Sequence, residues 1–292
     1  MTASTPTPAR APLGGRGFRR LLSRPAGLAG VIILLILGVV AGLSVTQLMG
    51  LDPLAQDAPS RLLPPSMDHL MGTDQFGRDV FARVASGLAN SALISMCAVA
   101  FAAVIGTLSG VVAGYARGWV DLIIGGGTNV LFAFPPLLLA LTLASVLDRT
   151  WFTVAIAIGV VYVPIFVRVT RGPVLSLREV EFVRAARSTG MSASGIMFRH
   201  VMPNVTSIII VQIALSLSWA VLTEASLSFL GIGAPPPAPS LGSMIFEART
   251  LVTIAPWTLF APGMVIVLLV VGLNLLGDGL RDTFDPRMRG QR

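Results

Sequence analysis

The sequence predicts an all-α membrane protein that crosses the bilayer six times. Its mean hydropathy is +0.80 and only 12% of its 292 residues are charged, which separates it from soluble domains of similar length. Each of its long apolar stretches can span about 30 Å of hydrocarbon, which takes roughly 20 helical residues. These stretches lie near Ala26–Gly50, Ser91–Tyr115, Leu122–Leu147, Phe152–Val167, Val205–Phe229 and Trp257–Leu276.

The arginines predict the orientation. All 21 basic residues are arginine, and with the N-terminus in the cytoplasm only a minority falls on the outer side. An excess of positive charge on cytoplasmic loops is typical of membrane proteins, and six spans return the C-terminus to the cytoplasm. We therefore attribute the basic pI to topology and to attraction by the inner leaflet, not to nucleic-acid binding. The outer arginines would be Arg61, Arg78, Arg83, Arg149 and Arg249.

Along the chain, four regions are expected. Residues 1–24 should form a disordered basic tail. Residues 25–90 should hold the first span, an external loop and an amphipathic interfacial helix that starts near Val80. That helix is either a ramp into the second span or a contact surface for an external partner. Residues 91–277 should form a five-helix core, and residues 278–292 a cytoplasmic tail that caps the long loop 168–204.

Several kinds of chemistry are excluded by composition. The chain has no lysine, so it cannot contain the Gly-x-x-x-x-Gly-Lys-Ser/Thr loop of a P-loop ATPase. Its two histidines, His69 and His200, fall on opposite sides of the predicted membrane, which rules out a shared zinc site. Cys97 lies inside a span and is expected to be a small packing residue. We therefore predict no catalytic residue, metal or cofactor in this chain.

The polar segment 168–204 is too long for a simple turn between spans. Ser176 to Glu179 has the pattern of a capping box, which predicts a short helix from Leu177, and Gly190 is its natural stop. Ser192 can cap a second short helix that runs toward Pro203. The alternative is a merely solvated charged helix. A partner could approach the first helix closely at its small residues, Ala185 and Ala186. The charged residues around them, Glu181, Arg184 and Arg187, would fix the register of that partner.

These motifs resemble the C-type permease subunits of oligopeptide and dipeptide ABC importers, over about residues 25–289. Permeases of ABC importers carry Glu-Ala-Ala, then Gly four residues on, then Ile-x-Leu-Pro; here Arg184 replaces the first Glu and His200 replaces Ile. After Gly87 the chain has Leu88-Ala89 where many relatives have Ala-Arg. The closer resemblance rests on six further segments: His69–Arg83, Phe132–Ala140, Arg178–Arg187, Arg199–Asn204, Glu224–Gly231 and Leu275–Asp282.

The resemblance implies the type I ABC importer permease fold with cytoplasmic coupling helices, in the bacterial plasma (inner) membrane. It also implies a homologous B-type permease partner, two ATPase subunits or one fused ATPase, and an external substrate-binding protein. ATP and magnesium would act in the ATPases, and peptides would be the substrate. Nickel, haem, glutathione or another small solute is the alternative within this family, and a secondary transporter is the alternative class. The ATPase-coupling residues would be Glu181, Arg184, Ala185, Ala186, Arg187, Gly190 and Pro203.

Polar residues in the spans suggest where a substrate passes. In the fifth span a polar stripe recurs at helical spacing, which places it against a water-filled path or another helix. The adjoining Glu224 is either a gate or half of a structural ion pair. Pro135 and Pro136 should bend the third span. The external loop 231–256, with one Glu247–Arg249 pair, should fold against the pore mouth and meet the binding protein. The stripe consists of Gln212, Ser216, Trp219 and Thr223.

Overall fold

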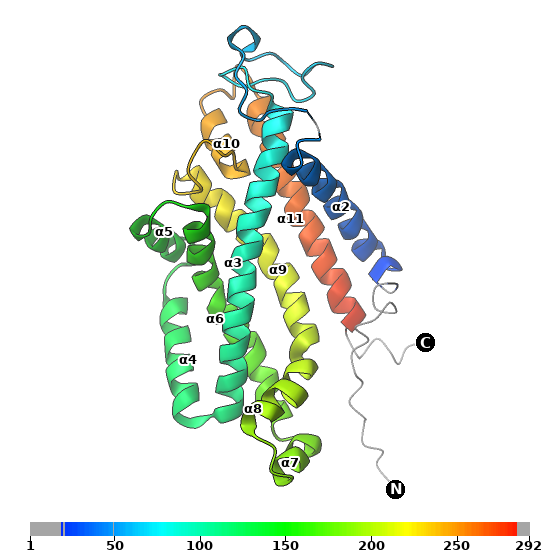
Figure 1. Cartoon of the computed structure of the whole chain (residues 1–292), viewed down its shortest axis with the longest axis vertical. Helices are drawn as coiled ribbons and strands as arrows, with labels where there is room; N and C mark the ends of the chain where they lie inside the picture. The colour runs from blue at the N-terminus through cyan, green and yellow to red at the C-terminus, as the bar shows by residue number, and fades with distance from the viewer. Residues whose placement is uncertain (1–18, 20, 49, 285–292) are drawn as a thin grey trace.

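The computed structural model describes residues 19, 21–48 and 50–284, which form a long helical bundle (Figure 1). Most of the predicted tail 1–24 and residues 285–292 lie outside the described residues. No strand occurs in the described part, where a single bridge joins Thr73 to Asp79. The elements are α2 (Pro25–Val45), η1 (Ala58–Ser60), α3 (Val80–Ala116), α4 (Gly118–Ala133), α5 (Pro136–Val146), α6 (Trp151–Leu177), α7 (Glu181–Ser188), α8 (Ala193–Ile196), the π-helix η2 (Met197–Val201), α9 (Met202–Phe229), α10 (Leu241–Ala248) and α11 (Trp257–Phe284).

The predicted all-helical membrane fold is confirmed. Among the described residues, five helices are long and apolar enough to cross a membrane, and the bent pair α4 and α5 brings the number to the predicted six when it is counted as one span. The five are α2, α3, α6, the continuous helix from α8 to the end of α9, and α11. Their exposed sides carry many large apolar residues, as lipid-facing surfaces require, because lipid tails cannot solvate polar groups.

The third predicted span is two helices instead of one. α4 and α5 meet at an angle of 95°, a sharper break than the bend we predicted. Phe134 adopts an extended conformation with ψ 139°, because the proline that follows it disfavours helical geometry. Pro136 then starts α5, at a position where its missing N–H costs nothing. The Pro-Pro pair thus ends one helix and begins the next.

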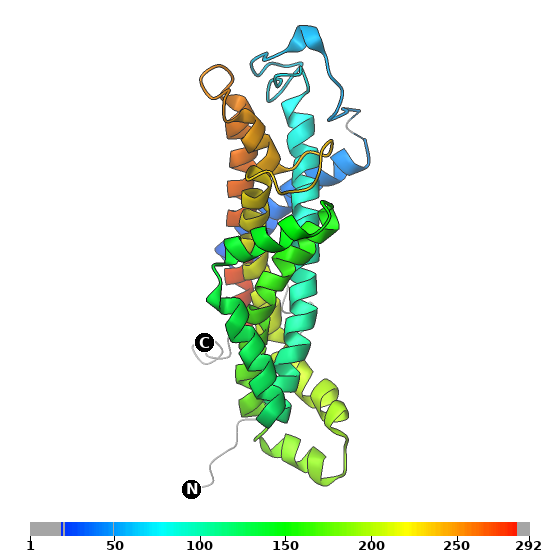
Figure 2. The same cartoon turned by 90° about the vertical axis from the view of Figure 1, so that its left-hand side faces the viewer.

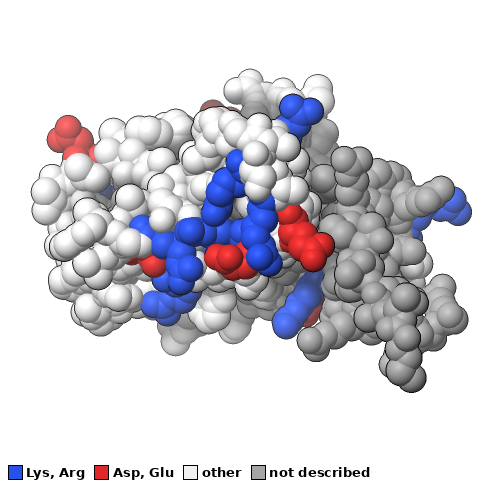
Figure 3. Space-filling view, turned by 90° about the horizontal axis from the view of Figure 1, so that it is seen from below, with Lys and Arg blue, Asp and Glu red and all other residues white. Residues whose placement is uncertain are grey.

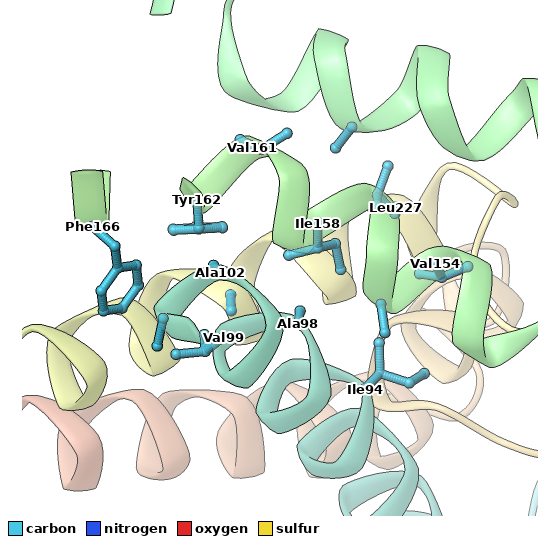
Figure 4. Close-up of a cluster of buried hydrophobic side chains, with 14 residues drawn as sticks. Ile94, Ala98, Val99, Ala102, Val154, Ile158, Val161, Tyr162, Phe166 and Leu227 are labelled. Atoms are coloured by element: carbon cyan, nitrogen blue, oxygen red, sulfur yellow. The ribbon is translucent and has the colours of Figure 1, made fainter. Parts of the chain in front are cut away.

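The centre of the bundle is the packing of α3 against α6. Figure 4 shows part of this core, where Ala98 and Ala102 of α3 face Ile158 and Tyr162 of α6. Farther along the same interface, three glycines of α3 lie four residues apart and touch the α6 backbone or side chains directly. A Cβ atom built on any of them would approach α6 within 2.9 Å, so only glycine allows this separation. They are Gly106, Gly110 and Gly114.

Two predicted boundaries are wrong because helices continue through them. The helix near Val80 is the first part of α3, which confirms a ramp into the second span but not a boundary at residue 90; Asp79 caps it, since its side chain accepts a hydrogen bond from the Ala82 amide at 2.8 Å. The C-terminal segment from residue 278 continues α11 to Phe284 and packs near the start of α2, not on the 168–204 loop. Gly279 approaches Gly27 there, and Asp282 lies 3.9 Å from Arg24. In both places helical hydrogen bonding persists beyond the apolar stretch that sequence reasoning used as a boundary.

Candidate coupling element and translocation path

The polar segment 168–204 contains fewer loop residues than predicted. α6 continues to Leu177, so Arg168 lies inside a helix instead of at its end. The predicted capping box at Ser176 is wrong, because this serine is in the last turn of α6 and α7 starts only at Glu181. The segment from Ala193 onward is helical without interruption into α9. The connection between the two spans is therefore α7 with a few flanking residues.

Two predicted end signals in this segment are confirmed. Gly190 follows α7 with φ +81°, a left-handed conformation that glycine adopts without strain. Its amide donates to the Arg187 carbonyl oxygen at 3.1 Å, and the Met191 amide donates to Ala186 at 3.2 Å. Ser192 caps α8, since its hydroxyl oxygen accepts from the Gly195 amide at 3.2 Å. Gly190 and Ser192 therefore fix where α7 ends and where α8 begins.

Pro203 lies in the first turn of α9, directly after the π-helix η2. A proline lacks the amide hydrogen that would bond to the carbonyl four residues earlier, and a π-turn accommodates such a gap. The side-chain amide of the neighbouring Asn204 donates to the His200 carbonyl oxygen at 2.6 Å. Pro203 itself is exposed, on the same end of the bundle as α7.

The inner face of α7 is held by the rest of this chain. Val183 is fully buried and Ala186 is only 9% exposed, in a cluster with Val111, Ile196 and Val205. The prediction that both alanines offer a close approach to a partner is therefore wrong for Ala186. The cluster that covers it combines α8 and η2 with the ends of α3, α6 and α9, because the apolar side of so short a helix is stable only when it is covered. Ala185, one position earlier, is exposed.

The outer face of α7 is charged and open to solvent. Arg184 donates from Nε to the Glu179 carbonyl oxygen at 2.9 Å, so its guanidinium is held beside the helix start. Figure 3 looks onto this end of the bundle, where arginine side chains gather with a few acidic ones among them. α7 forms the lower end of the helical bundle in both side views (Figures 1 and 2). The exposed predicted coupling residues on α7 are Glu181, Arg184, Ala185 and Arg187.

The polar residues predicted as a stripe in α9 differ in exposure. Ser216 is buried and accepts a hydrogen bond from the Gln212 amide nitrogen at 3.0 Å, so it faces the bundle interior. Thr223 is half-buried, with its hydroxyl 3.1 Å from that of Tyr162 in α6. Trp219, in contrast, is 64% exposed. Of the predicted path residues, Trp219 lies on an open surface, and Gln212 and Thr223 lie at its edge.

Glu224 is completely buried in this chain, which contradicts the expected ion pair, while its role as a gate stays a prediction. Its Oε1 atom accepts a hydrogen bond from Ser228 at 2.7 Å, and Ser91 and Ser240 adjoin the same carboxyl group. Within the described part of the chain, Oε2 has no hydrogen-bond partner and no basic side chain forms an ion pair with this residue. It therefore sits in a serine-lined niche where α3, α9 and the start of α10 meet.

A network of charged side chains lies at the end of the bundle opposite α7. Arg83 in α3 is only 2% exposed, and its Nη2 atom lies 2.9 Å from Glu247 of α10. Arg78 contacts the same Glu247 oxygen at 3.0 Å and Asp74 at 2.6 Å. The predicted Glu247–Arg249 pair is thus wrong, and Arg249 stacks on the Phe246 ring at 3.6 Å instead. These contacts join the loop before α3 to the 231–256 segment.

Known proteins match this chain over nearly its whole length. Residues 104–290 match the family described as the binding-protein-dependent transport system inner membrane component. The dipeptide transport system permease protein DppC of Alkalihalophilus pseudofirmus is 40% identical over 273 residues, 93% of this chain and 89% of that protein. A putative peptide transport system permease protein of Brucella suis is 37% identical over 93% of this chain and 91% of its own length.

The glutathione transport system permease protein GsiD of Pectobacterium atrosepticum is 40% identical over 225 residues, 77% of this chain and 75% of that protein. The chain belongs to the binding-protein-dependent permease family. It is therefore a multi-pass inner-membrane permease of an ABC importer, and the resemblance drawn from its motifs is confirmed. Members of this family are membrane subunits that generally carry no catalysis of their own.

Sequence reasoning missed two features of this permease. The glycine spacing at Gly106, Gly110 and Gly114 is a small-xxx-small repeat, a readable signal for close helix packing that we did not use. The second feature is Tyr115, whose ring lies near the guanidinium groups of both Arg178 and Arg187. No sequence pattern predicts that contact, because it joins residues more than 60 positions apart.

Proposed function

We propose that this chain forms half of the translocation pore of an ATP-driven peptide importer. A homologous B-type permease would complete the pore, and two ATPase subunits or one fused ATPase would bind at the α7 end. That end is cytoplasmic in this proposal, as are both termini, and the 46–79 and 231–256 segments face an external substrate-binding protein. The chain itself needs no cofactor, because ATP and magnesium act in the ATPases.

The observation that carries the proposal is the arrangement of α7. Its apolar side lies in a cluster with α8, η2 and the ends of α3, α6 and α9, while Glu181, Arg184 and Ala185 are exposed at the tip of the bundle. A partner that pushes on this surface would move the ends of α3, α6 and α9 together. Rigid-body rocking of the bundle would then alternate access to a path at mid-membrane.

The exposed side of α9 around Trp219 is the best candidate for the path wall. An indole N–H in a membrane helix needs a hydrogen-bond partner, which water or a substrate can supply in a pore but lipid tails cannot. Gln212 and Thr223 flank the same side and would add polar contacts. Ser216 and Glu224 are buried inside this subunit, so we leave them out of the proposed path.

The coupling surface is tested by Ala185→Trp in the complex co-expressed with its candidate partner subunits. The tryptophan projects from an exposed helix, so insertion and the melting temperature should stay near those of the unmodified chain. Co-purification of the ATPase and ATP-dependent uptake of radiolabelled peptide in proteoliposomes should both fall sharply. Ala55→Trp, an exposed alanine in the opposite end's loop, is the matched control for ATPase co-purification.

Unchanged co-purification and uptake in Ala185→Trp would remove α7 from the ATPase interface. Uptake that proceeds without any ATPase would instead favour a secondary transporter. The relatives named for glutathione transport supply one specific second substrate, since glutathione is itself a small peptide. Competition of unlabelled dipeptides, longer peptides and glutathione against labelled dipeptide uptake separates these choices.

A further inference from the structure

Tyr115 lies at the point where α7 contacts the end of α3. The guanidinium carbon of Arg187, from α7, is 5.5 Å from the centre of its ring, and that of Arg178 is 5.9 Å away. Both distances fall within the range in which a cation is attracted to an aromatic ring. The side chain is buried, which protects the contacts from full hydration.

Two hydrogen bonds strengthen the same contact. Nη1 of Arg178 donates to the main-chain carbonyl oxygen of Tyr115 at 2.6 Å, and Nη2 of Arg187 lies 3.5 Å from its hydroxyl. The carbonyl belongs to the last turn of α3, where helical carbonyls lack partners within the helix. Arg178 satisfies one of them and brings positive charge to the negative end of the helix dipole. We call these three residues, Tyr115, Arg178 and Arg187, the tyrosine clamp.

The clamp joins α7 to a long rigid element. α3 runs unbroken from Val80 to Ala116, 37 residues or about 55 Å at 1.5 Å per residue, with the clamp near its last residue and Arg83 in its first turn. The glycine contacts at Gly106, Gly110 and Gly114 hold it directly against α6. Because Arg83 contacts Glu247 of α10, a displacement of the clamped end reaches the other side of the membrane domain.

We propose that Tyr115 is a positioning residue that transmits the motion of α7 to α3 during ATP-driven transport. This inference rests on the proposed function, since it assumes that an ATPase moves α7. In this proposal the contacts of the Tyr115 ring with two arginines pass the motion of α7 to α3, in addition to the apolar packing of Val183 and Ala186. Loss of the ring should leave the ATPase bound while less of its motion reaches the pore.

The experiment measures peptide uptake per ATP hydrolysed in proteoliposomes that contain the complete transporter. Tyr115→Leu removes both cation–ring contacts, and we expect uptake per ATP to fall about fivefold or more while ATPase co-purification persists. Tyr115→Phe keeps the ring and should stay near the unmodified ratio. Phe132→Leu removes a similar ring that lies 4.2 Å from Arg168 but touches no part of α7, and it should also stay near that ratio.

A double-mutant cycle distinguishes this role from a merely structural one. If Tyr115 acts through Arg187, then Arg187→Met combined with Tyr115→Leu should lower the ratio no further than Tyr115→Leu alone, which already removes the contact with Arg187. Arg184→Met, which lies on the same helix but not on the ring, should add its effect independently. If Tyr115→Leu fails to assemble, Arg187→Met alone must show the lowered ratio, because it removes one cation from an exposed position.

Uptake per ATP that is unchanged in both Tyr115→Leu and Arg187→Met would overturn the proposal. Full additivity of these two changes would overturn it as well. An unmodified complex with no ATP-dependent uptake would instead overturn the proposed function, and this inference with it. The two failures are thus separated by the behaviour of the unmodified transporter.

Discussion

Gly110→Val should weaken the packing of α3 on α6, the most extensive helix pair in the described part of this permease. A Cβ atom at Gly110 would lie 2.7 Å from the Val167 carbonyl oxygen and 2.9 Å from Cβ of Thr170. The first distance is 0.7 Å short of the 3.4 Å at which ordinary van der Waals contact begins. The obstructing atom is main chain, so it cannot rotate away, and the two helices must separate.

The expected cost follows from the size of this conflict. Overpacking of a well-packed core costs about 1–3 kcal/mol, and valine adds two further methyl groups beyond the clashing Cβ. Glycine to valine also changes helix propensity by a few tenths of a kcal/mol in favour of valine. The net free energy of unfolding should therefore fall by roughly 1–3 kcal/mol.

The assay is thermal unfolding of the purified permease in one detergent, followed by circular dichroism and by exposure of Cys97 to a thiol reagent. Gly38→Val is the matched control, because it makes the same substitution in the middle of α2 where no atom lies within 4 Å of the new Cβ. The midpoint for Gly110→Val should fall by several degrees, and the control should stay within about one degree. Equal midpoints for the two variants would refute the argument that backbone contact at Gly110 sets the α3–α6 distance.

Three further outcomes are expected. Gly190→Val should cost about 1–2 kcal/mol of local stability, because φ +81° is strained for a branched residue although its Cβ meets nothing, and ATPase co-purification should fall with it; unchanged co-purification and uptake would argue against a role for this turn. Glu224→Gln should keep uptake and melting near normal, because an amide can satisfy the surrounding serines, whereas lost uptake at normal stability would restore a gate role for the charge. Glu247→Ala should speed hydrogen exchange across α10, since Arg83 and Arg78 lose their shared carboxylate, and exchange as slow as in the unmodified chain would show that apolar packing alone holds α10.

The helical membrane class, the number of spans and the family could be read from the sequence alone. Apolar runs of bilayer length are local features, and only helices satisfy their own backbone groups within one segment of lipid-exposed chain. The turn at Gly190 and the cap at Ser192 were predictable for the same reason, because both depend on residues within one turn of each other. The family rests on motifs that are themselves short and continuous.

Only the tertiary structure decided which residues of each helix are buried against its neighbours and which partners they meet there. Ala185 and Ala186 are neighbours in sequence, yet only the second is buried, because the ends of α3, α6 and α9 converge on one side of α7. Glu224, for which the sequence left a gate and an ion pair open, accepts a hydrogen bond from Ser228, and Arg83 reaches Glu247 across 164 residues. Such contacts depend on how whole helices pack, and helix periodicity specifies a face without specifying what lies against it.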